Sequence, residues 1–390
     1  MSVALDRDQA FLDAVRRIGE EVAAPNAADV DRQARFPAES IAALREQHML
    51  SCLLPGALGG GDVSFRAVAA ACFELGRHCG ASAMVFAMHQ IQVATLLRHP
   101  EGAGWFEHYL SSVAEEQRLI ASVTSEVGNG GDMGRSVAAA EPAEAGLRFE
   151  KQAPTVSFGE YADDLLTTLR RAPDAEPGDQ VIVLTRSEQN TLQPNGTWDP
   201  LGMRGTCSPG FVVRSEFAPE QVLPTPFARV AAESMVPISH LLWSHLWLGI
   251  ATDAFDRARA FARAAARRSP GRELPSARRL SALMSELSLM RADVSSALDE
   301  FCRASEDPDR AWLSTVSAAL RFNNLKISAS EQAPRLCQGA LEVCGIMGYR
   351  NDSPFSVGRH LRDALSASLM ISNERIHQTN ANLLLIAKDV

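Results

Sequence analysis

Three segments of the chain carry titratable side chains that could do acid–base chemistry. His240 lies in the apolar segment "VPISHLLWSHLWLG", His89 in the apolar segment "AMVFAMHQIQVATLL", and Glu374 in "ISNERIHQ" near the C-terminal end. A neutral imidazole or a carboxylate held in a pocket can take a proton from a substrate as a general base. The alternatives are a buried histidine whose hydrogen bonds are satisfied and a glutamate on a solvated helix face.

The elements that must position these residues follow the order helix, strand, helix along the chain. Apolar residues recur at helical spacing through the first third, and again from residue 239 to the end. Between them lie short β-rich runs such as "QVIVLTR" and "FVVRSEF", separated by Gly, Pro, Asn and Asp. We therefore expect a mainly α protein with an inserted β domain: an N-terminal helical domain at residues 1–117, a middle β domain at 118–228 and a C-terminal helical bundle at 229–390.

Composition restricts the class of protein. With 390 residues, 46% of them hydrophobic and 22% charged, the chain can bury a large core, and its net charge of −9 argues against a general nucleic-acid binder. The seven cysteines form no CxxC pair, and their odd number suits a reducing compartment. The N-terminal segment has no basic run followed by an apolar one. We expect no uncharged apolar stretch of about 18 residues, the nearest being "MVPISHLLWSHLWLGIAT". These features predict a cytoplasmic protein without a membrane span.

Two further segments carry a resemblance to a known family. Together with the α, β, α order, "LGMRGTCSPGFVV" (201–213) and "LEVCGIMGYRNDSPFSVGRHLRDA" (341–364) resemble the acyl-CoA dehydrogenase family of flavoproteins. The resemblance implies an N-terminal helical domain, a middle β-barrel or β-sandwich domain and a C-terminal four-helix bundle, in a homotetramer or homodimer. It also implies that FAD lies between the β domain and the bundle and reaches a neighbouring subunit. The family removes the α and β hydrogens of an acyl thioester, so the substrate implied is an acyl-CoA or an acyl carrier protein.

The resemblance places part of the cofactor site in the β domain. The segment "SVTSEVGNGGD" (122–132) resembles the family's T-E-P-G-A-G-S-D, which implies flavin contacts from Thr124 and Ser125. Gly130 and Gly131 would let the backbone approach the ligand closely, although an ordinary β turn is the alternative for this run.

A second flavin contact is implied by "EKQAPTVSFGEYAD" (150–163), which resembles the family's K-x-W-I-T-N. Thr155 falls at the threonine position and Ser157 lies nearby. Ala153 stands where the family has its tryptophan, which would leave that flank of the flavin more open.

The bundle carries the other cofactor residues that the resemblance implies. Arg267 in "AARRSPGRELPSARRLSALMSEL" corresponds to an arginine that reaches the FAD pyrophosphate across the subunit interface; alternatively it only complements the dipole of its helix. In "EVCGIMGY", Gly345 and Gly348 match glycines that let the adenosine-phosphate arm of FAD approach the backbone. No strand precedes these glycines, so a Rossmann fingerprint is not implied.

The catalytic glutamate of the family is missing. Arg362 and Asp363 correspond to the family's R-D pair, which we expect to form a buried ion pair. Counting onward to the place where most members carry the glutamate reaches Ile371. Counting back from Gly249 to the place where a minority carry it reaches Ser239, which His240 follows.

Glu374, His240 and His89 are therefore candidates for a relocated base, beside Ser239 at the minority position. A carboxylate opposite the flavin would take the α proton while the flavin accepts the β hydride. The first hypothesis is an FAD-dependent dehydrogenase of an unusual acyl thioester, with such a relocated base. The second is a flavin-dependent monooxygenase on the same fold, which needs no carboxylate base. The third is a catalytically degenerate member that only binds its ligand.

Overall fold

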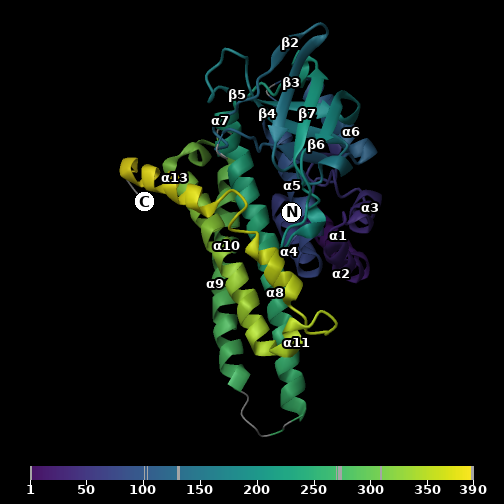
Figure 1. Cartoon of the computed structure of the whole chain (residues 1–390), viewed down its shortest axis with the longest axis vertical. Coiled ribbons are helices and arrows are strands. Elements are labelled where there is room, and N and C mark those ends of the chain that lie inside the picture. Colours follow the sequence, from purple (N-terminus) through teal and green to yellow (C-terminus); the bar gives the residue numbers. More distant parts are fainter. Residues whose placement is uncertain are drawn as a thin grey trace.

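The computed structural model describes residues 2–100, 102, 104–129, 132–268, 270, 275–307 and 310–387. Helices dominate at both ends of the chain, and the strands lie together between them (Figure 1). The predicted fold class, mainly α with an inserted β domain, is confirmed. The N-terminal helices are α1 (Ser2–Ile18), α2 (Ala24–Gln33), α3 (Ala38–Glu46), α4 (Phe65–His78), α5 (Gly80–Arg98) and α6 (Gly104–Glu116).

Helix α5 is the buried centre of the N-terminal domain. Sixteen of its 19 residues are buried, because other helices and the β domain cover it on all sides. The helix is long and apolar enough to cross a membrane, but 89% of its most apolar window is buried inside the protein. Residues 80–97 contain no Asp, Glu, Lys or Arg, so the expectation that the chain has no uncharged apolar stretch of this length was wrong.

The β domain consists of two sheets. One has the strand order β1-β4-β5, in which β1 pairs with β4 in parallel, and the other is antiparallel in the order β2-β3-β7-β6. Residues of β4 and β5 are buried on both faces, whereas β3 and β7 alternate between buried and exposed positions. The strands are β1 (Ile120–Val123), β2 (Glu141–Ala143), β3 (Gly146–Ala153), β4 (Asp164–Arg170), β5 (Gln180–Arg186), β6 (Asn190–Pro194) and β7 (Phe211–Phe217).

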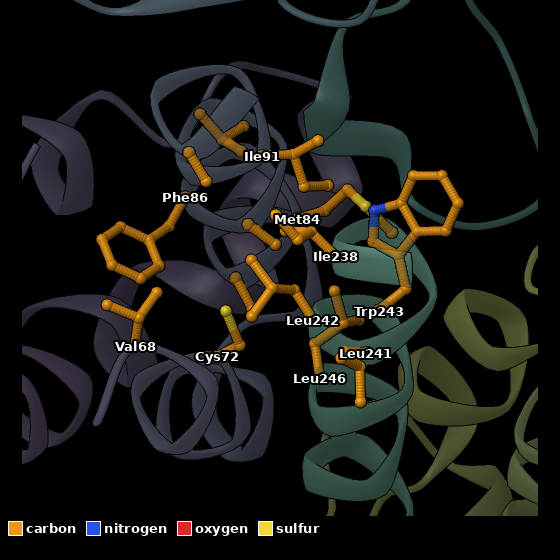
Figure 2. Close-up of a cluster of buried hydrophobic side chains, with 14 of the residues drawn as sticks. Val68, Cys72, Met84, Phe86, Ile91, Ile238, Leu241, Leu242, Trp243 and Leu246 are labelled. Carbon is orange, nitrogen blue, oxygen red and sulfur yellow. The ribbon is translucent and has the colours of Figure 1, made fainter. Parts of the chain in front are cut away.

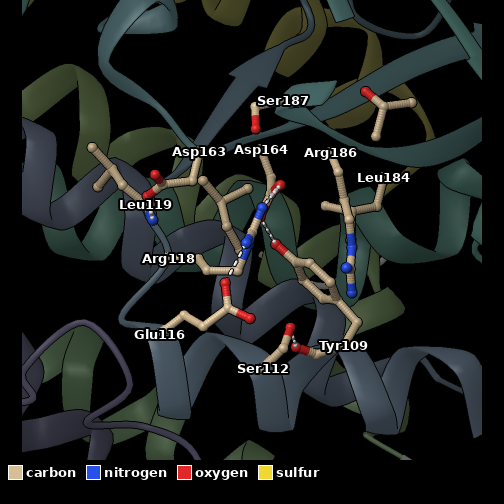
Figure 3. A network of polar contacts seen from close by, with 12 residues as sticks. Tyr109, Ser112, Glu116, Arg118, Leu119, Asp163, Asp164, Leu184, Arg186 and Ser187 are labelled. Atoms are coloured by element: carbon tan, nitrogen blue, oxygen red, sulfur yellow. Dashed lines mark hydrogen bonds and ion pairs between the residues drawn. The ribbon is translucent and has the colours of Figure 1, made fainter. Parts of the chain in front are cut away.

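A polar network joins the N-terminal helices to the β domain (Figure 3). Asp164, buried at the start of β4, accepts two hydrogen bonds from Arg118 at 2.6 and 2.7 Å and one from the Tyr109 hydroxyl at 2.7 Å. A bidentate arginine–carboxylate pair is among the stronger polar contacts in proteins. The network therefore fixes α6 against the edge at which β1 and β4 begin.

Three long helices form most of the C-terminal bundle, and the short helix α12 packs against two of them, α8 and α10. Helices α8 and α4 also cross so closely that their backbones touch. A Cβ atom on Gly249 would lie 2.2 Å from the carbonyl oxygen of Phe73, and one on Gly76 would lie 2.5 Å from that of Leu246. Around this crossing, apolar side chains of α4, α5 and α8 interdigitate (Figure 2). The helices are α7 (Phe227–Val230), α8 (Val236–Arg268), α9 (Pro275–Glu306), α10 (Val316–Cys344), α11 (Ile346–Tyr349), α12 (Gly358–Leu365) and α13 (Asn373–Ile386).

Candidate active site

A buried lysine occupies the region where the family's glutamate is missing. The ammonium nitrogen of Lys326, in α10, donates to the carbonyl oxygen of Ile371 at 3.1 Å and to Oδ1 of Asn373 at 2.6 Å. Asn373 is held in turn by Ser330, whose hydroxyl lies 3.0 Å from the Asn373 amide nitrogen. Lys326 thus ties the segment before α13 to the middle of α10.

The Lys326 side chain is completely buried, and desolvation lowers its pKa to about 7. Among the described residues, no carboxylate forms an ion pair with it, and only the more distant Glu331 opposes the lowering of its pKa. Lys326 was not among the residues predicted from the sequence. Its spacing could have indicated burial, because Lys326 lies on the same face of its helix as Phe322, Ala329 and Ala333, all of which are buried.

His240, on helix α8, lies close to Lys326 of α10. Its Nδ1 donates to the carbonyl oxygen of Phe322 at 3.1 Å, because a carbonyl can only accept, and this assigns the lone pair to Nε2. Burial, together with the charge of Lys326, lowers the pKa of His240 to about 3, so the ring is neutral. Nε2 is buried without a hydrogen-bond partner in the part of the chain that the structure describes.

Neither position that the resemblance gives for the glutamate offers a proton acceptor of comparable strength. The hydroxyl of Ser239 donates to the Val236 carbonyl one turn earlier, at 2.9 Å. Ile371 has a φ of +43°, which is strained for a β-branched residue, and its carbonyl oxygen faces Lys326. Lys326 connects the regions of the two positions, since it donates to the Ile371 carbonyl and lies one helical turn from Phe322, whose carbonyl accepts from His240.

The other two candidate bases lie elsewhere. Glu374 is exposed in the first turn of α13. His89 is buried with both nitrogens engaged: Nε2 donates to the Leu50 carbonyl at 2.7 Å, and Nδ1 accepts from the Ile120 N–H at 3.1 Å. These bonds make His89 a link between α5, the loop after α3 and strand β1. They leave it no free lone pair, and we do not include it in the site.

The two segments of the β domain that resemble flavin motifs come together. The hydroxyl of Ser125, just beyond β1, donates to the Thr155 carbonyl at 2.6 Å, so the segments around Thr124 and Thr155 lie side by side. Ser157 accepts from the hydroxyl of Ser208 at 2.9 Å. Hydroxyls and backbone groups on partly exposed loops suit the hydrogen-bonding groups of a flavin ring, so these residues fit a flavin. Gly130 and Gly131 lie outside the described residues.

The remaining cofactor candidates lie at the opposite end of the molecule, where α8 ends and α11 begins (Figure 1). Arg267 lines a surface hollow of about 240 Å³ together with Arg259 and Arg263. Gly345 is exposed with a φ of +56°, and no atom lies within 4 Å of the place where a Cβ would stand, whereas Gly348 packs against Cys344. A single chain therefore presents its cofactor candidates in two separate groups.

The Arg362 and Asp363 expectation needs a correction. The two side chains do not pair with each other: Arg362 forms its ion pair with Asp31 of α2, and Asp363 accepts the Met203 N–H at 2.7 Å. Adjacent residues on α12 point in different directions, so each reaches a different neighbour. Burial raises the pKa of Asp363 to about 6. The motif thus fixes α12 to both the N-terminal domain and the loop before β7.

An α, β, α fold with segments at the end of β1 and after β3 that resemble the family's flavin motifs indicates the class of protein, a flavoprotein oxidoreductase. The protein-family model "Acyl-CoA dehydrogenase, N-terminal domain" matches residues 6–117, and the family model "Acyl-CoA dehydrogenase, C-terminal domain" matches residues 232–376. The chain belongs to the acyl-CoA dehydrogenase family.

The relatives of the chain include two kinds of enzyme. Cyclohexane-1-carbonyl-CoA dehydrogenase from Geobacter metallireducens is 24% identical over 385 residues, which cover 96% of this chain and 95% of that protein. Dibenzothiophene monooxygenase from Mycolicibacterium goodii is 29% identical over 237 residues, which cover 57% of this chain and only 56% of that protein. The solved structure of FMN-bound TdsC from Paenibacillus sp. A11-2 has a TM-score of 0.79 at 22% identity and covers 97% of both chains. That likeness concerns the fold.

Proposed function

We propose that this protein is a flavin-dependent monooxygenase that transfers one oxygen atom of dioxygen to a small organic substrate. One observation supports the proposal: beside the two positions at which the counts ended, Ile371 and Ser239, lie a buried lysine and a neutral histidine rather than a carboxylate. Removing an α proton from a thioester requires a general base. A carboxylate suits this role because it becomes neutral when it takes the proton, whereas a histidine becomes positively charged. An additional positive charge next to Lys326 is costly in a desolvated site.

Oxygen transfer makes different demands on the site. Reduced flavin activates dioxygen, which is the chemistry that the cofactor supplies when bound. The protein has to hold the substrate near the flavin, exclude water and provide hydrogen-bond donors and acceptors. One oxygen atom enters the substrate and the other leaves as water, with both electrons coming from the reduced flavin.

The described residues divide these tasks. Thr124, Ser125, Thr155 and Ser157 would hold the flavin ring through hydroxyl and backbone groups. Lys326 holds the segment at Ile371 in place, and the buried Nε2 of His240, which has no partner among the described residues, can accept a hydrogen bond from the substrate.

The second group of cofactor candidates suggests an oligomer. Arg267, near the end of α8, and Gly345, just before α11, lie on parts of the bundle that are remote from the β domain that holds Ser125 (Figure 1). We propose a homodimer or homotetramer in which these residues meet the flavin nucleotide bound by a second copy. Such contacts would favour FAD over FMN, since only FAD has an adenosine diphosphate arm.

Dehydrogenation of an acyl thioester is the second candidate function. It is favoured by the relatives that cover most of the chain, which include the cyclohexane-1-carbonyl-CoA dehydrogenase. In that case His240 would be the relocated base, because Glu374 is exposed on the single chain.

Two measurements on the flavin-loaded protein distinguish the functions. In the first, oxidised protein is mixed anaerobically with a panel of CoA and carrier-protein thioesters, and a dehydrogenase would lose its flavin absorbance near 450 nm, roughly the usual flavin band. In the second, reduced flavin is supplied in air and oxygen consumption is recorded with candidate substrates. We expect oxygen consumption that depends on substrate and no bleaching. Bleaching by a thioester would refute the monooxygenase proposal.

A further inference from the structure

Four polar side chains form a buried stripe on α8: His240, Trp243, Ser244 and Trp247. At 100° per residue they fall within an arc of about 100° on the helix surface. Their exposed fractions are 1%, 6%, 0% and 0% in that order. Within the described ranges, His240 Nε2, the two indole N–H groups and the Ser244 hydroxyl have no hydrogen-bond partner.

Such a stripe requires an explanation. Each buried polar group without a partner costs about 1–3 kcal/mol, and folded proteins contain few of them. Twelve other buried side-chain atoms of the described residues also lack a partner, but no other element carries four of them. The indole N–H of Trp198, by contrast, donates to the Arg204 carbonyl at 3.0 Å. Four unsatisfied groups on one stripe, next to Lys326, indicate that a bound molecule provides the missing partners.

The polar atoms define the hydrogen-bonding groups of that molecule. Three of the four can donate, and His240 Nε2 can only accept, because its Nδ1 carries the proton. A hydroxyl group satisfies both kinds at once: its hydrogen donates to His240, and its oxygen accepts from an indole N–H. A protonated amine does not fit, since Lys326 is close to His240 and, among the described residues, no carboxylate forms an ion pair with either side chain.

The walls of the stripe favour an aromatic skeleton. The rings of His240 and Trp243 are 6.2 Å apart between centroids, and those of Trp243 and Trp247 are 6.4 Å apart. Met84 of α5 and Trp243 face each other in Figure 2. Flat rings pack well against indoles and a methionine thioether.

We infer that the stripe from His240 to Trp247 binds the hydroxyl group of a neutral aromatic substrate, a phenol or an aryl alcohol. This inference rests on the proposed function and names the substrate class for that same site. Ser244 and Trp247 lie one turn further along α8 and would meet a second oxygen atom of the same molecule. This substrate class excludes cations, and it excludes simple hydrocarbons because they would leave all four polar groups without a partner.

The indole N–H groups provide a direct test. The chain has five tryptophans, so protein labelled with ¹⁵N in the indole ring and loaded with flavin gives a spectrum of few resonances, each assigned by a Trp→Phe variant. Phenol, toluene and benzylamine, which share one phenyl ring, are then titrated as probes. We expect phenol to shift the Trp243 resonance downfield and to bind at least about tenfold more tightly than toluene, a difference of 1.4 kcal/mol. Trp198, already hydrogen-bonded, serves as the internal control and should not move.

Two variants separate hydrogen bonding from packing. His240→Phe and Trp243→Phe should each reduce the preference for phenol over toluene while leaving toluene binding unchanged. The inference is overturned if phenol and toluene bind equally, if benzylamine binds best, or if Trp243 already shows the shift of a hydrogen-bonded indole and does not respond to phenol. The readout does not depend on oxygen consumption, so its failure and that of the monooxygenase proposal can be told apart.

Discussion

Replacing Lys326 with methionine should change how the stability of the protein depends on pH. The pKa of Lys326 is lowered from 10.5 to about 7 in the folded protein. At 1.36 kcal/mol per pH unit, this difference corresponds to about 5 kcal/mol. Between these two values, the unfolded chain binds a proton that the folded protein does not, so the free energy of unfolding rises with pH. The part of the free energy of unfolding that depends on Lys326 titration therefore reaches its full value above pH 10.5 and decreases as the pH falls towards 7.

Methionine has a similar length and no charge, so it removes the proton together with the bonds to Ile371 and Asn373. The loss of those bonds costs about 1–3 kcal/mol at every pH. We therefore expect the wild type to gain about 3 kcal/mol on the variant between pH 7.5 and pH 9.5. Urea unfolding of both proteins, followed by tryptophan fluorescence at several pH values, measures this difference and cancels all other titrating groups.

Arg335→Met is the matched control. Arg335 is exposed on the same helix, so its difference from the wild type should be flat. A flat difference for Lys326→Met as well would mean that the folded protein keeps Lys326 charged. That result would refute the statement that burial without a neighbouring carboxylate lowers the pKa of Lys326.

Three further predictions concern other parts of the molecule. Gly249→Ala should destabilise the protein by about 3 kcal/mol or more, since its Cβ would collide with an α4 carbonyl, whereas Gly104→Ala, with open space around it, should leave the melting temperature unchanged. Glu374→Gln should retain flavin absorbance and at least about half of the turnover, because the side chain is exposed; a complete loss would return the residue to the catalytic site. Ser125→Ala should weaken flavin binding about five- to tenfold in a fluorescence titration, through release of the Thr155 segment, and unchanged affinity would remove that segment from the cofactor site.

The fold was predictable because its signals are local. Helical spacing and β-rich runs gave the order of helices and strands, and five of the seven strands coincide with runs that were apparent in the sequence. Strands β2 and β6 were not apparent because they are short, mostly exposed and contain proline, so they lack the apolar alternation that marks a half-buried strand.

The site was only partly predictable because it depends on contacts between distant segments. His240 was a candidate from its apolar neighbours, and the two counts for the missing glutamate ended on Ile371, which contacts Lys326, and on Ser239, the residue before His240. Lys326 was missed because a lysine is ordinarily exposed, and its partners Ile371 and Asn373 lie far along the chain. The Asp31 partner of Arg362 lies near the opposite end of the sequence, where no local pattern connects them.

The close crossing of α4 and α8 has a consequence for folding kinetics. Gly76 and Gly249 bring two backbones into contact, although the entire β domain lies between them in the sequence. Closing so long a loop is entropically costly, and contacts of this kind form late in folding. The β domain should therefore be structured before the helices on either side of it lock together. A chain released from the ribosome with a slow β domain would expose the apolar faces of α4 and α8 at the same time.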